Sequence, residues 1–296
     1  MAQASVFDRT QVRRQRDRAA AAFADHSFLF DEVAERLADR LLDVTRRFPR
    51  ALDLGCHTGV MRRALSGRGG IEWLVECDLS PAMTRAAGNS AGGRAVADEE
   101  VLPFADRSFD LVLSNLSLHW VNDLPGALVQ INRALEPDGL FLATMLGGET
   151  LRELRRCFIE AEMAEEGGAG PRVSPFADVR DAGALLQRAG FALPVVDIDT
   201  ITITYGEPLR LLADLRGMGE TNATLGRRKT MTRRATIARA LDLYRESYAD
   251  ADGRVPATFQ ILTLTAWRPH DSQQKPLARG SGRASLADVL RPDDKK

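Results

Sequence analysis

The chain has 296 residues, 44% of them apolar, so it can bury a full hydrophobic core. Forty Lys and Arg residues stand against 41 Asp and Glu residues, and the formal net charge of -1 excludes a global positive field that would draw the chain onto nucleic acid. The three cysteines form no Cys-x-x-Cys pair, which argues against a zinc site and a disulfide framework. We therefore expect no nucleic-acid partner and no metal.

No stretch of the sequence has the run of about 20 apolar residues that crosses a bilayer. The N-terminus is rich in Arg and Ala, but it contains Asp8, Asp17 and Asp25 and lacks the apolar part of a secretory signal. It is equally unlike a mitochondrial transit peptide, in which acidic residues are scarce. We expect a mature cytoplasmic protein without an integral membrane segment.

The first half of the chain alternates between helix and strand patterns. Apolar residues recur at helical spacing within 10–47 and predict two helices that pack on, or cover, the part that follows. The next predicted strands are 51–54, 71–76, 94–97, 109–115 and 139–146, and the helices between them are 60–65, 82–87 and 124–135. This alternation is typical of a doubly wound, Rossmann-like α/β fold with a parallel sheet between two layers of helices.

The second half is less regular. It predicts a charged helix over 149–166, a glycine-rich break, a helix over 178–189, a strand over 193–205, helical sequence over 207–249 and a last strand over 256–267. About fifty residues separate the last two strands, whereas a hairpin needs only about two to five. We interpret 207–249 as a helical cap inserted into a domain that spans 48–268. N-terminal helices precede this domain at 1–47, and a mobile tail follows it at 269–296.

The turn after the first predicted strand is the first candidate for a ligand site. Gly55 and Gly59 flank it, and their missing side chains let a ligand approach the backbone N–H groups that open the next helix. Such turns are also common connectors, so the glycines alone decide nothing. Asp78 follows the second predicted strand, close to the spacing of about 20 residues at which an acid binds ribose hydroxyls. The alternative role of helix N-cap is already filled by Ser80.

An acidic run follows the third predicted strand. Asp98 can accept a hydrogen bond from an adenine amino group while Val101 or Leu102 packs on the ring, although Asp98 taken singly is a surface loop acid. Features of this kind at three successive strand ends share the carboxyl edge of one sheet, where such folds bind ligands. We therefore predict a ligand with adenine and ribose groups at this edge.

This arrangement resembles the class I S-adenosylmethionine-dependent methyltransferases. Residues 53–59 resemble the first motif of that family, 78–80 its second, and 102–104 with 109–112 its later motifs. The resemblance implies S-adenosylmethionine as cofactor, bound by Asp53, Gly55, Cys56, His57, Gly59, Asp78, Leu79, Asp98, Glu99 and Asn115. His57 stands where the family usually has its middle glycine. We expect its side chain to point away from the ligand or to meet the ligand carboxylate, the alternative being a blocked methionine pocket.

A closer resemblance covers nearly the whole chain. Blocks at 6–9, 13–15, 116–125, 217–222, 256–260 and 279–281 are similar to the mitochondrial respiratory complex I assembly factors of the methyltransferase superfamily. This implies a bacterial relative that acts on a complex I subunit, where the assembly factors are associated with hydroxylation of an arginine. The malonyl-carrier-protein O-methyltransferases of biotin synthesis are a more distant resemblance. We expect an enzyme with a protein or carrier-bound substrate; a non-catalytic assembly chaperone is the alternative.

Asn115, His119 and Trp120 are the candidate catalytic residues, because they lie at the end of the fourth predicted strand, where a substrate would enter. For His119 and Trp120 the alternative is a packed aromatic pair. Methyl transfer needs alignment and desolvation more than an acid–base pair. An iron hydroxylase would need two His and a carboxylate, and none of the four histidines begins a His-x-Asp or His-x-Glu pair. The basic residues 227–229 and 233–234 predict a solvated helix face, or else a docking site for an acidic partner.

Overall fold

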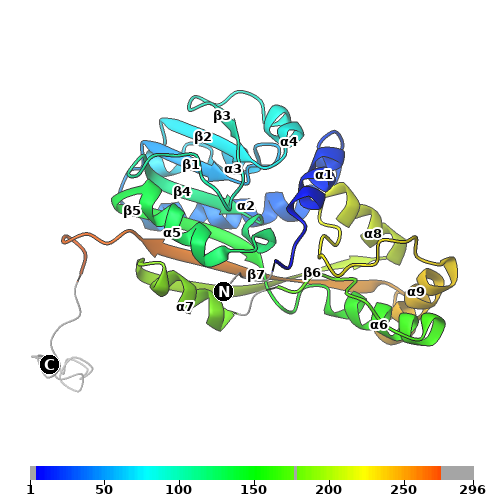
Figure 1. The fold of residues 1–296 in the computed structure, drawn as a ribbon. Helices are drawn as coiled ribbons and strands as arrows, with labels where there is room; N and C mark the ends of the chain where they lie inside the picture. The colour runs from blue at the N-terminus through cyan, green and yellow to red at the C-terminus, as the bar shows by residue number, and fades with distance from the viewer. Residues whose placement is uncertain (1–4, 177–178, 275–296) are drawn as a thin grey trace, which may run out of the picture.

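A mixed sheet forms the centre of the fold. The computed structural model describes residues 5–176 and 179–274, and within them seven strands run in the order β3-β2-β1-β4-β5-β7-β6 (Figure 1). The strands are β1 (Arg50–Leu54), β2 (Trp73–Asp78), β3 (Arg94–Val96), β4 (Phe109–Asn115), β5 (Leu135–Leu146), β6 (Ala192–Tyr205) and β7 (Val255–Trp267). The first five strands pair in parallel. The predicted Rossmann-like α/β fold is confirmed.

The two last strands differ from the parallel part of the sheet. β7 lies antiparallel between β5 and β6. The chain passes from β6 to β7 through α8 (Pro208–Gly217) and α9 (Arg234–Tyr248), and it returns alongside β6 without crossing over the sheet. Two paired strands whose connection does not cross over the sheet run antiparallel, whereas parallel neighbours need a crossover. The C-terminal end of β6 and the N-terminal end of β7 extend past the parallel strands toward α6 and α9 (Figure 1).

Helices cover both faces of the sheet. The helices α2 (Phe28–Asp39) and α3 (Val60–Leu65) pack on one face, and α5 (Leu124–Ala134) and α7 (Val179–Arg188) pack on the other. Side chains along β4 alternate accordingly, because successive residues of a strand point to opposite faces. The remaining helices are α1 (Arg9–Ala19), α4 (Pro81–Ala86) and α6 (Arg152–Glu166), with 3-10 turns at Phe23–Asp25, Arg40–Asp43, Arg68–Gly70 and Leu118–Trp120.

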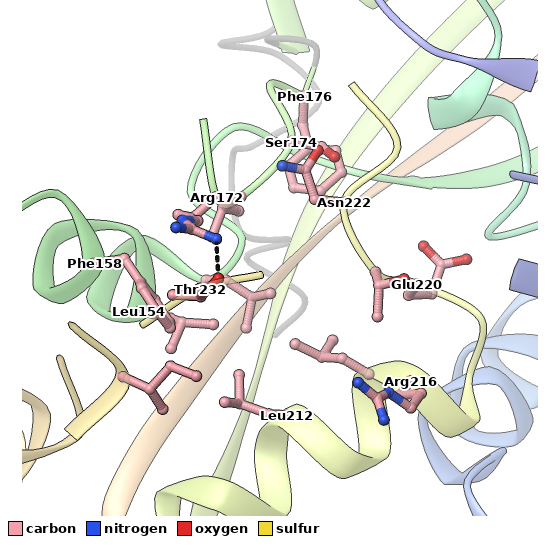
Figure 2. Close-up of a pocket in the computed structure, with 15 residues that line it drawn as sticks. Leu154, Phe158, Arg172, Ser174, Phe176, Leu212, Arg216, Glu220, Asn222 and Thr232 are labelled. Carbon is pink, nitrogen blue, oxygen red and sulfur yellow. Dashed lines mark hydrogen bonds between the residues drawn. The ribbon is translucent and has the colours of Figure 1, made fainter. Parts of the chain in front are cut away.

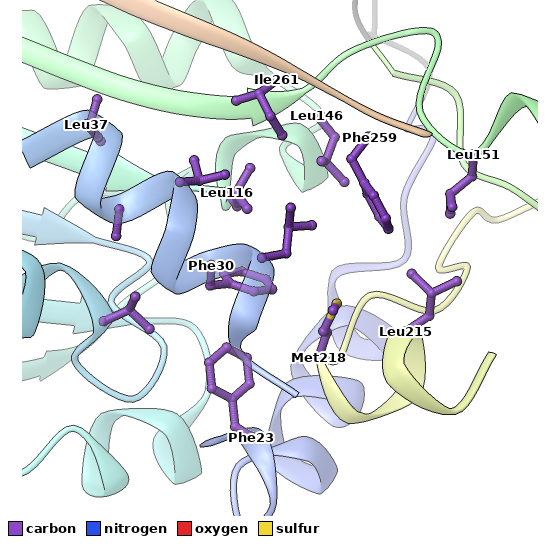
Figure 3. Packing of buried hydrophobic residues seen from close by; sticks show 14 of the residues in the cluster. Phe23, Phe30, Leu37, Leu116, Leu146, Leu151, Leu215, Met218, Phe259 and Ile261 are labelled. Atoms are coloured by element: carbon purple, nitrogen blue, oxygen red, sulfur yellow. The ribbon is translucent and has the colours of Figure 1, made fainter. Parts of the chain in front are cut away.

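The first forty residues contribute to the core, as their apolar pattern predicts. Phe23 and Phe30 are fully buried and meet edge to face, with 5.1 Å between ring centres. Figure 3 shows them in one cluster with Leu116, which follows β4, with Met218, which follows α8, and with Phe259 of β7. Burying a phenylalanine contributes roughly 1.5–3 kcal/mol. The cluster therefore joins the first forty residues to the sheet and to the cap.

The prediction of helical sequence over 207–249 is wrong for its middle. Between α8 and α9, residues 218–233 are irregular. Gly217 is the last residue of α8, and a Cβ there would lie 2.1 Å from the ring of His26. Gly219 has a φ of +77°, which favours glycine and is incompatible with a continuing helix. The domain limits drawn from the sequence stay predictions, and most of the predicted tail lies outside the described residues.

Candidate functional site

Two glycines shape the loop between β1 and α3. Gly55 and Gly59 have φ angles of +79° and +77°, where other residues are strained. A Cβ on Gly55 would lie 2.2 Å from the hydroxyl oxygen of Ser117, and one on Gly59 would lie 2.9 Å from a carboxylate oxygen of Glu76. Both positions therefore need glycine for their backbone angle and for their lack of space.

His57, in the middle of this loop, also has a left-handed backbone, with a φ of +49°. Its buried ring stacks on Phe23 with 5.5 Å between ring centres and meets Phe30 edge-on at 4.6 Å. Neither ring nitrogen has a hydrogen-bond partner. Burial, assisted by the charge of Arg16, lowers the pKa of His57 to about 4, so the ring is neutral at pH 7. The His57 side chain is thus accommodated by packing against two aromatic rings. Its orientation toward a cofactor stays a prediction.

Asp78 ends β2 and is fully buried. Its carboxylate accepts hydrogen bonds from the backbone N–H groups of His57 at 3.1 Å and Ser80 at 2.7 Å. Ser80 in turn caps α4, as expected, by accepting a hydrogen bond from the N–H of Met83 at 3.1 Å. Asp78 therefore fixes the glycine loop against the end of β2. Its contact with a ribose stays a prediction.

Two arginines of α1 reach the acids at this edge of the sheet. Arg9 Nη2 lies 2.6 Å from Asp98 Oδ1, and Arg9 also pairs with Glu99. Arg16 is fully buried, 3.0 Å from Glu99 Oε1 and 3.4 Å from the carboxylate of Asp78. Burial alone would raise the pKa of Glu99, but Arg9 and Arg16 lower it well below its usual range. The three acids predicted to bind adenosine are therefore already paired with cations.

Sequence reasoning missed Arg9 and Arg16. Each pairs with acids more than sixty positions away, and no local pattern reports such a distant contact. The available signals were the resemblance of block 6–9, which contains Arg9, and the spacing of two helical turns, which puts both side chains on the same face of α1.

Cys56, Leu79 and Asn115 are tied into the fold around the site. The thiol of Cys56 is buried, and burial raises its pKa well above the usual value. Leu79 packs against the cluster of Phe7, Val12, Trp120 and Ala223. Asn115 Nδ2 donates to the carbonyl of Phe30 at 2.9 Å, and its Oδ1 accepts from the hydroxyl of Thr144 at 2.9 Å. These contacts give all three residues a structural role, and their contact with a cofactor stays a prediction.

His119 and Trp120 share one carboxylate partner. His119 Nε2 lies 2.9 Å from Glu220 Oε2, and Trp120 Nε1 donates to the same oxygen at 3.0 Å. The Trp120 ring also meets Phe7 edge-on, with 5.3 Å between ring centres. Burial alone would raise the pKa of Glu220, but His119 and Arg16 lower it. Sequence reasoning missed Glu220, which lies a hundred positions further along the chain in the irregular part of the cap.

A pocket of about 250 Å³ lies beside Glu220, between α6, α8, α9 and the loop before α7 (Figure 2). A smaller enclosed space of about 20 Å³, which we call the inner space, lies next to it and is lined by Phe30 and His119. The two spaces share Leu151, Phe176, Leu215 and Glu220. Phe30 also touches the ring of His57, so one buried side chain separates the inner space from the glycine loop.

Comparison with known proteins identifies the family. A family model described as a methyltransferase domain matches residues 52–143. The protein named mitochondrial arginine-hydroxylase NDUFAF5 of Danio rerio is 47% identical over 289 residues, which cover 96% of this chain and 89% of that protein. The chain belongs to the methyltransferase superfamily. Another member, the malonyl-[acyl-carrier protein] O-methyltransferase of Halorhodospira halophila, is 36% identical over 293 residues and 97% of each chain.

A solved structure supports the fold of this methyltransferase-superfamily protein. The YcgJ protein from Bacillus subtilis aligns with a TM-score of 0.56 over 79% of this chain and 98% of that chain. The two sequences are 15% identical, so the likeness concerns the fold alone.

The residues of this methyltransferase-superfamily protein fit S-adenosylmethionine. Both carboxylate oxygens of Asp53, at the start of the loop, are buried without a hydrogen-bond partner, as are both ring nitrogens of His57. Burial, followed by the charges of Glu76 and Asp78, raises the pKa of Asp53 well above its usual value. The cofactor carries ammonium, hydroxyl and carboxylate groups that can pair with such atoms, and the two glycines let it approach the backbone.

Three further expectations concern metals, membranes and the basic cluster. Within residues 5–176 and 179–274, no group of three or more His, Cys, Asp or Glu side chains is placed to hold a metal ion. No helix in the same ranges is long and apolar enough to span a membrane. The predicted helix face is wrong for four of the five basic residues, because 227–229 and Arg233 lie in the irregular segment. There Arg227 and Arg228 pair with Asp8 and Glu166.

Proposed function

We propose that this protein is an S-adenosylmethionine-dependent enzyme that modifies a side chain of a respiratory complex I subunit in the bacterial cytoplasm. The closeness of the glycine loop to the pocket is the observation that supports it best. His57 of the loop touches Phe30, Phe30 lines the inner space, and Glu220 lines both that space and the pocket. A group bound in the loop and a side chain inserted through the pocket would meet there.

The chain's own residues would bind, orient and exclude water. S-adenosylmethionine supplies an activated methyl group on a sulfonium when bound. Gly55, Gly59 and Asp53 would hold it at the end of β1, with Asp78 and Asp98 on its adenosine part. Apolar residues such as Leu116, Leu146 and Phe259 line the inner space and would keep water from the reacting atoms. Alignment in such a dry space accelerates a displacement without a general base.

Two kinds of relative suggest the substrate. The higher identity is with a protein whose name is arginine-hydroxylase, which favours a protein side chain and leaves hydroxylation as the alternative to methyl transfer. The second candidate is O-methylation of a malonyl group on a carrier protein, favoured by the 36% identity over 97% of each chain with the malonyl-carrier enzyme.

Cells that lack the gene provide the test. We expect one complex I subunit from these cells to differ in intact mass from the same subunit of wild-type cells, by one methyl group or by one oxygen atom. The wild-type gene should restore the mass, and a Gly55→Val variant, whose side chain would collide with Ser117, should not. Restored assembly without any mass difference would identify a chaperone, and a requirement for biotin would identify the malonyl-carrier reaction.

A further inference from the structure

The outer edge of the sheet presents a row of backbone groups. Among the residues that the structure describes, β6 is the last strand on this side and pairs only with β7. The N–H of Gly147, which follows β5, donates to the carbonyl of Gln260 in β7 at 2.8 Å, so residues of β7 with even numbers face β5. Those with odd numbers face β6, where Ile261 lies opposite Asp199. In β6 the odd-numbered residues therefore pair with β7, and the N–H and C=O groups of the even-numbered residues 196–204 point outward.

Side-chain contacts agree with this direction. The N–H of Thr200 donates to the carboxylate of its neighbour Asp199 at 2.8 Å, and the carbonyl of Thr204 accepts from Arg254 at 2.5 Å. Over residues 5–176 and 179–274, the other outward N–H groups between 196 and 202 have no hydrogen-bond partner. The Asp199 side chain is 52% exposed, so its carboxylate can turn away when another strand approaches. The outward row of β6 can therefore form a further ladder, which ends at Thr204.

Little in the sequence of β6 keeps another strand away. Edge strands of folded proteins are usually short, or they are blunted by Lys, Pro or a bulge. In β6 the bulge and Pro194 lie at the start, before regular pairing with β7 begins at Val195. From 196 to 204 the strand contains only β-branched residues and two Asp, and the side chain of Ile198 is half exposed. Since β-branched residues favour strands, this edge is suited to pairing.

The two acids of this stretch are neutralised by their own chain. Arg40 pairs with Asp197 at 2.6 Å, and Arg36 pairs with Asp199. Both arginines come from α2 and the turn that follows it. The charges of these four side chains sum to zero, and the same holds for a second copy of the chain. No net charge at this edge therefore opposes contact between two copies.

Two copies of β6 fit each other when they pair antiparallel around Thr200. In this register Ile198 lies opposite Thr202 of the second copy, and the two residues exchange both backbone hydrogen bonds because both point outward. No acid of one copy then lies opposite an acid of the other. Moving the centre by two residues to Ile198 would set Asp197 against Asp199, and like charges directly opposite each other are destabilising. The acids therefore select the centre at Thr200.

This centre lies where the sheet has room. The pairing of β5 with β7 stops at Leu146, opposite Ile261, so from Thr200 onward β6 and β7 extend beyond the parallel strands (Figure 1). The helix α7 packs on the other half of β6, where Val196 joins the cluster that contains Ala182 of α7. The extension can therefore meet its copy without α7 lying between them.

We propose that the outer edge of β6 is the interface of a homodimer, in which β6 of two copies pairs antiparallel around Thr200. The two sheets would join into one. Such a two-fold contact uses the same surface on both copies, so it covers both free edges at once and leaves none for a third copy. The proposal does not depend on the proposed function, because neither the glycine loop nor the pocket takes part.

Sedimentation velocity of the full-length protein tests the interface. The wild type should change from monomer to dimer as its concentration rises between roughly 1 and 100 μM. Thr202→Pro removes an N–H that points outward, so it leaves pairing with β7 intact and should weaken dimerisation at least about tenfold. Thr202→Val is the matched control, because it keeps the N–H and a β-branched side chain and should dimerise like the wild type.

Lysine on the edge provides a second variant, which decides the matter if Thr202→Pro lowers the melting temperature. Ile198→Lys introduces a charge inside the ladder and should also yield monomers. Leu193→Lys alters an equally exposed residue, 51% against 50%, that precedes the ladder, and it should leave the dimer intact.

Three results would overturn the interface. The first is a wild type that stays monomeric over the whole range of concentrations. The second is a dimer that survives Ile198→Lys, or that survives Thr202→Pro with an unchanged melting temperature. The third is loss of the dimer in Thr202→Val, since the ladder requires the N–H of this residue and not its hydroxyl.

Discussion

At the scale of single residues, several buried ionisable groups lie at the cofactor edge, by which we mean the carboxyl ends of β1, β2 and β3. The charge of each group depends on its neighbours. Glu99 stays ionised in spite of its burial because two arginines face it, while Asp53, near Glu76 and Asp78, has no bonded cation and a raised pKa. The two acids are both fully buried, and their charged neighbours differ. This difference is typical of binding sites, where burial and specific charges push pKa values apart.

His57 provides a prediction about pH. The folded state holds this ring neutral, with a pKa of about 4 against 6.5 for the free side chain. The unfolded chain therefore binds the proton more readily, and stability should fall as the pH drops from about 6.5 to about 4, by roughly 3 kcal/mol at full protonation. In His57→Asn this part of the pH dependence should disappear, because Asn does not titrate and tolerates the left-handed backbone.

The measurement is urea unfolding of both proteins between pH 4 and pH 8, two values that span the titration of a free histidine at about 6.5. Other groups titrate in both proteins alike, so only the difference between the two stability curves reports His57. A difference that stays constant over the whole range would show that the ring is accessible to protons in the folded protein.

At the scale of elements, α1 is the part of the fold that changes the interpretation of the site. Its two arginines pair with Asp98, Glu99 and Asp78, so the helix lies over the positions predicted for adenosine. A ligand that uses Asp98 as a hydrogen-bond acceptor must compete with Arg9. The stronger these ion pairs are, the more they should lower the affinity for the cofactor.

Replacing Arg9 tests this competition. The Arg9 and Asp98 side chains are 13% and 30% exposed, and an ion pair of this kind contributes about 1 kcal/mol. We expect Arg9→Gln to bind adenosine about fivefold more tightly than the wild type, as measured by calorimetry. Arg13→Gln, on the exposed side of the same helix, is the matched control and should have no effect. Weaker binding by Arg9→Gln would instead make Arg9 a direct contact of the ligand.

Where the local sequence pattern sets the limits of a helix or strand, the predicted and observed end residues agree. The strand 109–115 is buried along its whole length, and the helix 60–65 begins directly after a left-handed glycine; both match the structure. The segment 218–233 is different, because its path depends on contacts with remote partners such as Asp8 and Trp120. Asp78, Asp98 and the glycines were predicted as site residues because they follow strands. Arg16 and Glu220 were missed because only the tertiary fold brings them to the site.

At the scale of the whole molecule, the first residues of the chain connect the cofactor edge to the cap. Phe7 forms a β-bridge with Thr224, the N–H of Asp8 donates to the carbonyl of Ala223 at 2.8 Å, and Arg227 pairs with Asp8 at 2.9 Å. The next residue, Arg9, reaches the acids after β3. The N-terminal segment, residues 6–9, therefore contacts both sites, and a shift of α1 would be transmitted to the cap segment that contains Glu220.

Phe7→Ala tests this connection. The Phe7 ring is buried against Trp120. Replacing a buried phenylalanine by alanine lowers the free energy of unfolding by about 3 kcal/mol. If the N-terminal segment holds the cap, this loss should appear as local opening, with hydrogen exchange accelerated at the amides of Asp8, Thr224 and Leu225. Amides of β4 and β5 should keep their protection, because these strands pair inside the sheet. Val6→Ala, which shortens an exposed neighbour of Phe7, should leave exchange unchanged at both places. Uniform acceleration over sheet and cap alike would show that the cap and the sheet unfold as one unit and that the N-terminal segment does not hold the cap separately.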